Sequence, residues 1–213
     1  MPTITALAPQ KRRPDRISVF VDGEFVLGLS ARTARALDLY VGRELDAAEI
    51  ESWGVAAEGD RAYDRALRYL RPRLRSRHEI EQRLRRYGYG RDVEQAVISR
   101  LAEAGYVDDR AFAEAWIRDR LRLRPKGRRA LRAELAKKGV VSEDVAAALA
   151  EADEEAEEEV ARRALAPRRE LYRGRGEGPG RRAATAFLAR RGFGVEVARR
   201  IVEEAFAAGS AEV

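Results

Sequence analysis

One pattern recurs three times along the chain and constrains its fold more than any other feature. Each copy has two apolar residues four positions apart, a glycine four positions later, an apolar residue after that glycine, and two more apolar residues a helical turn apart. The copies start at Ile80, Leu131 and Ala184, at intervals of 51 and 53 residues, and the second has one extra residue after its glycine. A repeat of this length predicts a tandem array of helical units, which usually presents a long surface to a partner.

The repeated residues are expected to hold each unit together. Apolar side chains at i and i+4 lie on one face of a helix, and a glycine at the helix end adopts the left-handed conformation without strain. The residue after the glycine then packs back onto the helix. We therefore assign a structural role to the repeat anchors Ile80, Leu84, Gly88, Tyr89, Leu131, Leu135, Gly139, Val140, Leu188, Gly192 and Phe193.

Strand and helix signals divide the chain into four segments. Asp22–Gly23 between alternating apolar runs predicts a β-hairpin, Ser30 is expected to cap a helix, and Asp46 a short second helix through Trp53. These features make up a β-rich N-terminal module, residues 1–58. Three-helix repeats are expected to follow at 59–107, 108–152 and 153–213, the last with a long, flexible Gly-rich loop at 173–180.

Helix boundaries within the repeats have signals of their own. Pro72 is expected to end one helix, and Ser76 with Glu79 to form a capping box at the start of the next. Ser142 is expected to cap the third helix of the second repeat. The fold class is therefore mainly α: three tandem three-helix repeats forming an elongated, curved molecule, with a small N-terminal β-hairpin and helix module.

Composition excludes several classes of protein. The chain has no Cys, which rules out a disulfide framework, a Cys-based zinc site and thiol catalysis. The first residues contain no apolar run long enough for a signal peptide, and no segment approaches a membrane span. We expect a cytoplasmic protein, acting as a monomer, without contact to a membrane.

Positive charge is concentrated in the first two repeats. Residues 60–110 hold 13 Arg and Lys against 9 Asp and Glu, and residues 111–150 hold 10 against 5, whereas both flanking segments are slightly acidic. Such a stripe attracts polyanions or an acidic protein face, although a merely solvated Arg-rich surface is the alternative. The candidate contact residues are the basic positions opposite the apolar stripes: Arg71, Arg73, Arg75, Arg77, Arg83, Arg85, Arg86, Arg118, Arg120, Arg122, Arg124, Lys126, Arg128, Arg129, Arg132, Lys137 and Lys138.

The sequence offers no pattern typical of catalysis. The single His, His78, lies beside two arginines and is interpreted as a surface residue. Gly174–Gly180 follows a helix rather than a strand, so it is not a dinucleotide-binding fingerprint, and the acidic run 153–159 is better explained as a solvated helix start than as a metal site. We expect no enzyme activity, no cofactor and no metal.

Two stretches carry a family resemblance. Gly105–Tyr106–Val107–Asp108–Asp109–Arg110–Ala111–Phe112–Ala113, followed by Trp116–Ile117–Arg118–Asp119–Arg120, resembles the signature of the RecX family of RecA regulators, and so does the block from Arg128 to Gly139. The N-terminal Val-Asp-Gly-Glu-Phe and Gly-Arg-Glu-Leu segments are similar to an extension carried by some members.

The resemblance implies a function. It implies a non-enzymatic regulator that binds RecA and its single-stranded DNA filament and mainly inhibits the recombinase, ATPase and co-protease activities used in DNA repair and the SOS response. Direct contact with DNA would lack sequence specificity. The alternative is an autonomous DNA-binding protein of helix-turn-helix-like units, although residues 91–101 and 143–151 are too acidic or Ala-rich for a recognition helix. A scaffold that binds only proteins is a third hypothesis.

Overall fold

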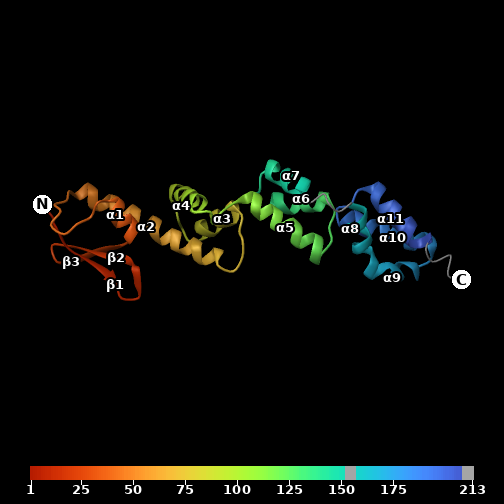
Figure 1. Ribbon diagram of the computed structural model, residues 1–213, viewed down its shortest axis with the longest axis horizontal. Coiled ribbons are helices and arrows are strands. Elements are labelled where there is room, and N and C mark those ends of the chain that lie inside the picture. Colours follow the sequence, from red (N-terminus) through yellow and green to blue (C-terminus); the bar gives the residue numbers. More distant parts are fainter. Residues whose placement is uncertain (152–156, 208–213) are drawn as a thin grey trace. The chain divides into compact units, whose positions relative to one another are not determined.

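The computed structural model describes residues 1–151 and 157–207, and these form one small sheet followed by helices (Figure 1). This confirms the mainly α fold with a β-containing N-terminal module. The chain divides into two compact units. The first holds Met1–Leu74 and Ile80–Val107, and the second holds Arg75–Glu79 and the chain from Asp108 onward.

The N-terminal sheet is antiparallel, with strands β1 (Ile4–Gln10), β2 (Arg13–Val21) and β3 (Glu24–Ser30) in that order. Asp22 and Gly23 both have positive φ, +49° and +88°, which confirms the predicted hairpin turn between β2 and β3. The inward residues Ile4, Val19 and Leu29 are fully buried and form one face of the first hydrophobic core.

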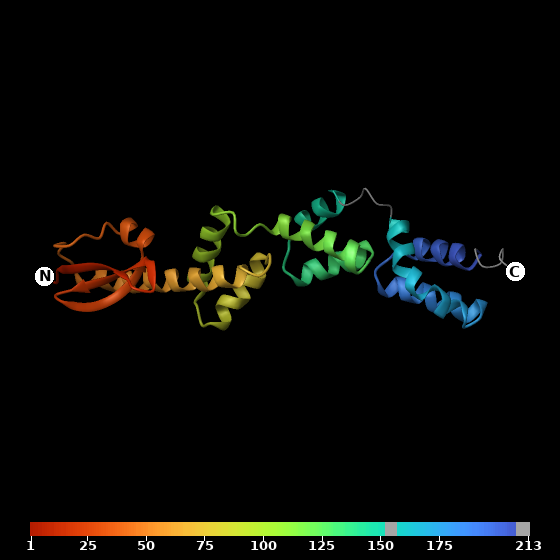
Figure 2. The same ribbon diagram turned by 60° about the horizontal axis from the view of Figure 1, so that its bottom comes forward.

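A short helix and then a long one follow the sheet. Ser30 caps the short helix α1 (Ala31–Ala36) as predicted, because the Thr33 N–H donates to its hydroxyl at 3.0 Å. Asp46 and Glu49 then form a capping box at the start of α2 (Ala47–Leu70), which runs unbroken for 24 residues (Figure 2). The expectation of a short helix ending after Trp53 was wrong, and the proposed boundary after residue 58 falls inside α2.

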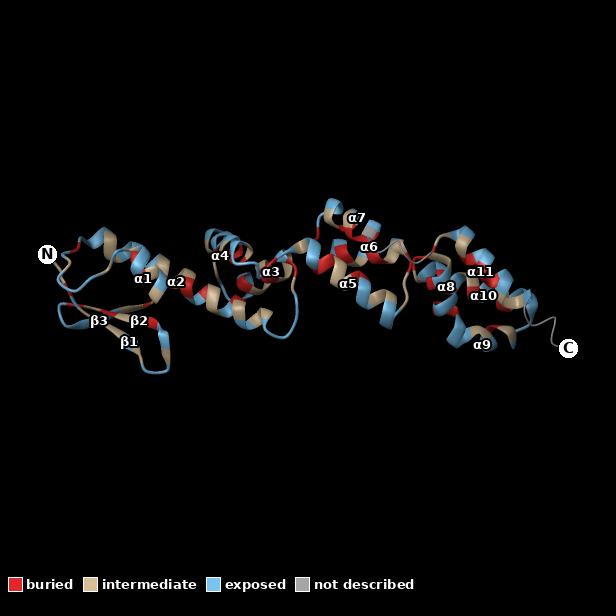
Figure 3. Cartoon of the chain, viewed as in Figure 1, coloured by how far each residue is buried: buried red, intermediate tan, exposed pale blue. Residues whose placement is uncertain are grey.

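Burial on both halves of α2 explains its continuity. Trp53 and Ala57 pack in the core with the sheet, whereas Ala62 and Ala66 pack in the core of the first repeat. Buried positions therefore recur along the whole helix (Figure 3). Glycines within a helix cost about 1 kcal/mol each, which burial of two apolar faces outweighs.

The first repeat is completed by α3 (Arg77–Arg86) and α4 (Arg91–Glu103). Ile80 and Leu84 are fully buried against Val97 and Ile98, and Tyr89 packs against the same core while partly exposed. Gly88 ends α3 with a φ of +83°. The helix α3 contributes its first three residues to the second unit and the remainder to the first.

The second repeat consists of α5 (Asp109–Leu123), α6 (Arg128–Lys137) and α7 (Ser142–Glu151). Its core combines Phe112 and Ile117 with the anchors Leu131, Leu135 and Val140. Ser142 is the first residue of α7 rather than its cap, a difference of one position, which is within the usual uncertainty of helix ends.

The third repeat has more helices than expected. It contains α8 (Glu157–Leu165), the 3-10 turn η2 (Ala166–Arg168), α9 (Arg169–Arg173), α10 (Glu177–Arg190) and α11 (Val195–Ala207). Its core includes the anchors Leu188 and Phe193. The acidic residues 153–156 lie outside the described residues, and Glu157–Glu159 form the first turn of α8.

The expectation of a flexible loop at 173–180 was wrong for residues 177–180, which are helical. Only a tight turn at 174–176 separates α9 from α10, and residues 177–180 form the first helical turn of α10. A Cβ at Gly180 would lie 2.1 Å from the Tyr172 carbonyl oxygen. Glycine there allows close packing of α10 on α9, so this part of the Gly-rich segment serves packing rather than flexibility.

Candidate interaction surface

One partly buried carboxylate, that of Glu134 on α6, binds side chains from α5 and from the loop between α5 and α6. Glu134 accepts hydrogen bonds from Trp116 Nε1 and Arg120 Nε, both at 3.0 Å, and from Lys126 Nζ. Partial burial would raise the pKa of Glu134, but these three donors outweigh it and lower the pKa below its usual value. The carboxylate therefore stays ionised and ties two candidate cations to the fold.

Two further candidates also have partners within the second unit. Lys138 Nζ lies 2.7 Å from Glu79 Oε1 and 5.1 Å from the centre of the Trp116 ring, and the Arg128 guanidinium donates to the Leu149 carbonyl at 3.4 Å. The Arg120 guanidinium stacks 4.0 Å above the Trp116 ring. Basic side chains held by such contacts stabilise the fold of the second repeat.

The remaining candidates of the second repeat point into solvent. On α5, Arg118 and Arg122 are four residues apart and lie opposite the buried face formed by Phe112 and Ile117. Within residues 1–151 and 157–207, no ion pair or ring contact occupies the exposed candidates of this repeat: Arg118, Arg122, Arg124, Arg129, Arg132 and Lys137. These six side chains, the second-repeat cations, are available to an external anion.

The first-repeat candidates are more mixed. Arg71 and Arg86 are exposed, whereas the Arg83 guanidinium lies 5.3 Å from the Tyr69 ring centre and 5.0 Å from that of Tyr87. The Arg73 guanidinium donates to the Leu74 carbonyl at 2.9 Å. Arg85 pairs at 2.9 Å with Glu94, whose side chain is almost completely buried. No local signal marks the Glu94 pairing, because it joins two different helices, α3 and α4.

Arg75 and Arg77 lie in segment 75–79, which belongs to the second unit although the chain on either side of it belongs to the first. Ser76 Oγ donates to the Lys138 carbonyl at 2.6 Å, and the Arg77 N–H donates to Asp109 Oδ1 at 2.8 Å. Burial raises the pKa of Asp109, and the bond from Arg77 only partly offsets it. Segment 75–79 is thus held by side chains of the second repeat.

His78 belongs to this contact. A Cβ built on Gly139 would lie 2.4 Å from the His78 Cβ, so the two residues are in tight van der Waals contact. The interpretation of His78 as a plain surface residue therefore needs correction: it is partly buried and packs against the glycine turn after α6. No local signal marks this role, because the two residues are distant in sequence.

The second-repeat cations have side-chain groups that are suited to anions. The described residues contain no group of three His, Asp or Glu side chains arranged to hold a metal ion. Within the same part of the chain, no helix is both long and apolar enough to cross a bilayer. The second-repeat cations provide charge and hydrogen-bond donors that suit phosphates or carboxylates.

Comparison with known families matches most of the chain. Residues 2–46 match the regulatory protein RecX N-terminal domain, residues 62–101 the first RecX three-helix domain, and residues 108–149 the second.

Curated relatives agree with these matches. Regulatory protein RecX of Mycolicibacterium smegmatis is 40% identical over 147 residues, which is 67% of this chain and 78% of the relative. That of Lactobacillus johnsonii is 34% identical over 155 residues, 73% of this chain and 57% of the relative. That of Mycobacteroides abscessus is 46% identical over 102 residues, which is 48% of this chain and 50% of the relative. The matched regions thus span only 57% and 50% of the length of the last two relatives.

Solved structures support the same fold. A crystal structure of regulatory protein RecX aligns with a TM-score of 0.85 at 24% identity, covering 95% of this chain and all of that one. The crystal structure of RecX from Lactobacillus salivarius aligns with a TM-score of 0.63 at 23% identity, covering 70% of this chain and 97% of that one. The three domain matches and the identity to the mycobacterial relative together confirm the resemblance carried by the residues around Asp108 and Arg128: this chain belongs to the RecX family of regulatory proteins.

Proposed function

We propose that this protein binds RecA and its single-stranded DNA filament in the cytoplasm and mainly inhibits the filament's ATPase, recombinase and co-protease activities. The observation that carries the proposal is the second RecX three-helix domain, which presents six exposed cations that make no ion pair or ring contact with the described part of the chain. The protein acts as a monomer by binding, without catalysis of its own.

The charge distribution supports this proposal. A filament that carries DNA presents closely spaced phosphates, and lysine or arginine contacts to phosphates release condensed counterions. Binding through the second-repeat cations therefore weakens steeply as salt rises. The partnered group, namely Arg120, Lys126, Arg128 and Lys138, shapes the surface that carries them.

ATP hydrolysis by RecA on single-stranded DNA tests the proposal. Adding this protein at substoichiometric amounts should slow hydrolysis, and the effect should diminish as salt is raised. Unchanged hydrolysis at an equimolar ratio would show that the chain does not regulate RecA. Co-sedimentation with RecA filaments, with and without DNA, separates loss of binding from binding without inhibition.

A matched pair of variants locates the contact. Reversing Arg118, Arg122 and Arg129 to Glu should weaken inhibition at least tenfold, because three exposed phosphate or carboxylate contacts become repulsive. The control reverses three exposed arginines of the third repeat to Glu: Arg182, Arg190 and Arg199. Equal loss in both variants would assign the effect to net charge rather than to the second repeat, and full inhibition by the first variant would remove the surface from the proposal.

The alternative of sequence-reading helix-turn-helix units has less support. Only one basic and one amide side chain are among the exposed residues of α4, which are Arg91, Asp92, Gln95, Ala96, Ser99 and Glu103. The exposed residues of α7 for which burial is described include neither kind: Ser142, Glu143, Ala146 and Ala150. A recognition helix needs basic and amide side chains toward the base edges of the major groove. These third helices of the repeats are therefore poor candidates for reading DNA sequence.

A further inference from the structure

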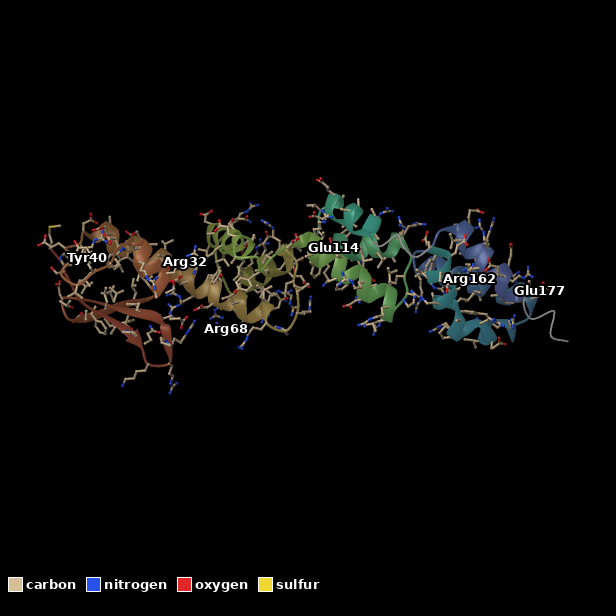
Figure 4. The ribbon with its side chains drawn as sticks, in the orientation of Figure 1. Arg32, Tyr40, Arg68, Glu114, Arg162 and Glu177 are labelled. Carbon is tan, nitrogen blue, oxygen red and sulfur yellow. The ribbon has the colours of Figure 1, made fainter. Side chains whose placement is uncertain are left out.

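A second basic surface lies on the first unit and is built around α2. Arg61, Arg65 and Arg68 follow the spacing i, i+4 and i+7, which places them on one face of this helix, and all three are exposed. None of these three arginines is among the candidate residues derived from the sequence. In the view of Figure 4, Arg68 is marked below α2, and Arg32, which belongs to α1, is marked above it.

Two open pockets adjoin on this face, since Arg13, Asp64 and Arg68 line both of them. The residues around the pair of pockets come from the three strands, from α2 and the residue after it, and from the segment that follows α4. Together these walls contain one aspartate and six arginines: Arg13, Arg16, Arg61, Arg65, Arg68 and Arg71. We name this surface the α2 groove.

Asp64 positions two of the arginines without neutralising both. Its Oδ2 accepts from Arg13 Nη1 at 2.7 Å and from Arg16 Nη1 at 3.0 Å. The side chain of Arg16 is nearly buried and also donates to the Gly28 carbonyl at 2.6 Å, and Arg13 has a further exposed partner in Asp15. One end of the groove is therefore a fixed guanidinium pair, which needs little ordering when an anion binds.

The rest of the groove keeps its positive charge. Arg65 lies 4.4 Å from the centre of the Tyr87 ring, a contact that orients the guanidinium but leaves its charge in place. Arg61, Arg68 and Arg71 have no ion pair within residues 1–151 and 157–207. Two acidic groups, Asp64 and Asp15, thus face six arginines, so the groove as a whole is cationic.

An aromatic side chain stands at the apolar end of the groove. Tyr106 lines it together with Leu67 and Leu70, and 53% of the tyrosine surface is exposed. Surfaces that bind single-stranded nucleic acids combine a cationic track for the phosphates with aromatic rings on which bases stack. An acidic peptide would use the arginines but would gain little from the exposed ring.

We propose that the α2 groove binds a single-stranded DNA segment directly, with its phosphates along Arg61, Arg65 and Arg68 and a base stacked on Tyr106. This contact is independent of RecA and of the second-repeat cations. Binding there is insensitive to base sequence, because a phosphate track and a stacking ring accept every nucleotide.

Fluorescence anisotropy of labelled oligo-dT with the full chain, in the absence of RecA, tests the α2 groove. Replacing Arg61, Arg65 and Arg68 by Gln should weaken binding about tenfold or more at low salt, and should reduce the slope of log K against log salt by about 2, at roughly 0.7 per phosphate contact on a single strand. The control replaces Arg32, Arg35 and Arg91 by Gln, which are exposed in the same unit but do not line the groove, and should bind as the wild type does.

Variants of Tyr106 distinguish the contribution of base stacking to binding from that of charge. Tyr106→Ala should weaken binding about tenfold with an unchanged salt slope, and Tyr106→Phe should bind like the wild type. The double variant Arg61→Gln with Arg68→Gln leaves the Arg65–Tyr87 contact intact, so it tests the charge if the triple variant is unstable.

Several outcomes would overturn the proposal. Equal weakening by the groove and control variants would mean that only net charge matters, and unchanged binding by the groove variants would exclude the groove. Tighter binding of a poly-aspartate peptide than of oligo-dT, with the same sensitivity to the arginine variants, would identify an acidic protein site instead. Because RecA is absent from these measurements, their failure is distinct from failure of the RecA assay.

Discussion

At the scale of single residues, the repeated glycines serve two purposes. Gly88, Gly139 and Gly192 all have positive φ, at +83°, +73° and +87°. A Cβ at Gly88 would meet open space, whereas one at Gly139 would lie 2.4 Å from His78 and one at Gly192 would lie 2.3 Å from the Ala130 nitrogen. In both of the tight cases the glycine turn of one repeat rests on the start of the second helix of the preceding repeat.

Alanine substitutions distinguish these purposes. Gly88→Ala should cost about 1 kcal/mol of unfolding free energy, the cost of a left-handed non-glycine residue. Gly139→Ala and Gly192→Ala should cost about 1–3 kcal/mol more, because the added methyl group overlaps packed atoms. Urea unfolding of the three variants measures the difference. Equal losses would show that the close approach carries no energetic weight.

Asp60 is the other residue whose role depends on the fold. It is 3% exposed, and its carboxylate accepts from the Ser30 N–H at 2.5 Å, the Thr33 hydroxyl at 2.8 Å and Arg100 Nη1 at 3.2 Å. Burial alone would raise the pKa of Asp60, but these donors lower it below its usual value. A lowered pKa means that the group stabilises the fold above its unfolded pKa and loses this contribution as the pH falls through the folded pKa.

Asp60→Asn should therefore destabilise the protein by about 2–4 kcal/mol at pH 7, since it removes a buried charge partner of Arg100 and mismatches the Ser30 donor. The difference from wild type should begin to shrink once the pH falls below the pKa of the unfolded state, about 4, and should go on shrinking until the pH has passed the lowered pKa of the folded state. Thermal unfolding at several pH values measures this. A gap that stays constant down to pH 3 would contradict the assigned role of the charge.

At the scale of elements, α2 shows how tertiary contacts extend a helix beyond its local signals. Gly54 and Gly59 lie inside α2, and a Cβ at either position would meet no neighbouring atom within 4 Å. Gly54 is exposed and Gly59 is partly exposed, while Trp53 and Ala66 pack in two different cores. Local propensity was overridden because apolar burial on both halves outweighs two helix-interior glycines.

Substitution at Gly59 tests this interpretation of α2. Gly59→Ala should stabilise the protein by about 0.5–1 kcal/mol, because alanine has a higher helix propensity and meets no neighbour. Gly59→Pro should destabilise it by about 3 kcal/mol or more by removing a hydrogen bond and clashing with the preceding turn. Circular dichroism melting compares the pair. Tolerance of proline would indicate that the two halves of α2 are separable.

At the scale of the whole molecule, the chain holds two compact units with separate cores. Local stability is then expected to differ between them. Gly192→Ala should speed amide exchange in α6 and α10 but leave α2 and the sheet unchanged, since only the second unit contains the altered contact. Hydrogen-exchange mass spectrometry measures this. Faster exchange throughout the chain would indicate a single cooperative unit.

The sequence by itself determined the mainly α fold, the hairpin at Asp22, the glycine stops and the family, because hydrophobic period, turn chemistry and motif are local properties of the chain. Only the tertiary structure decided that α2 is continuous, that the segment 177–180 is helical, and which cations are committed to Glu134, Glu94 or Asp64. A charge has the same local signature whether it is solvated or paired. Its partner comes from a distant element, so the cationic α2 groove, assembled from the three strands, α2 and Tyr106, could be recognised only in three dimensions.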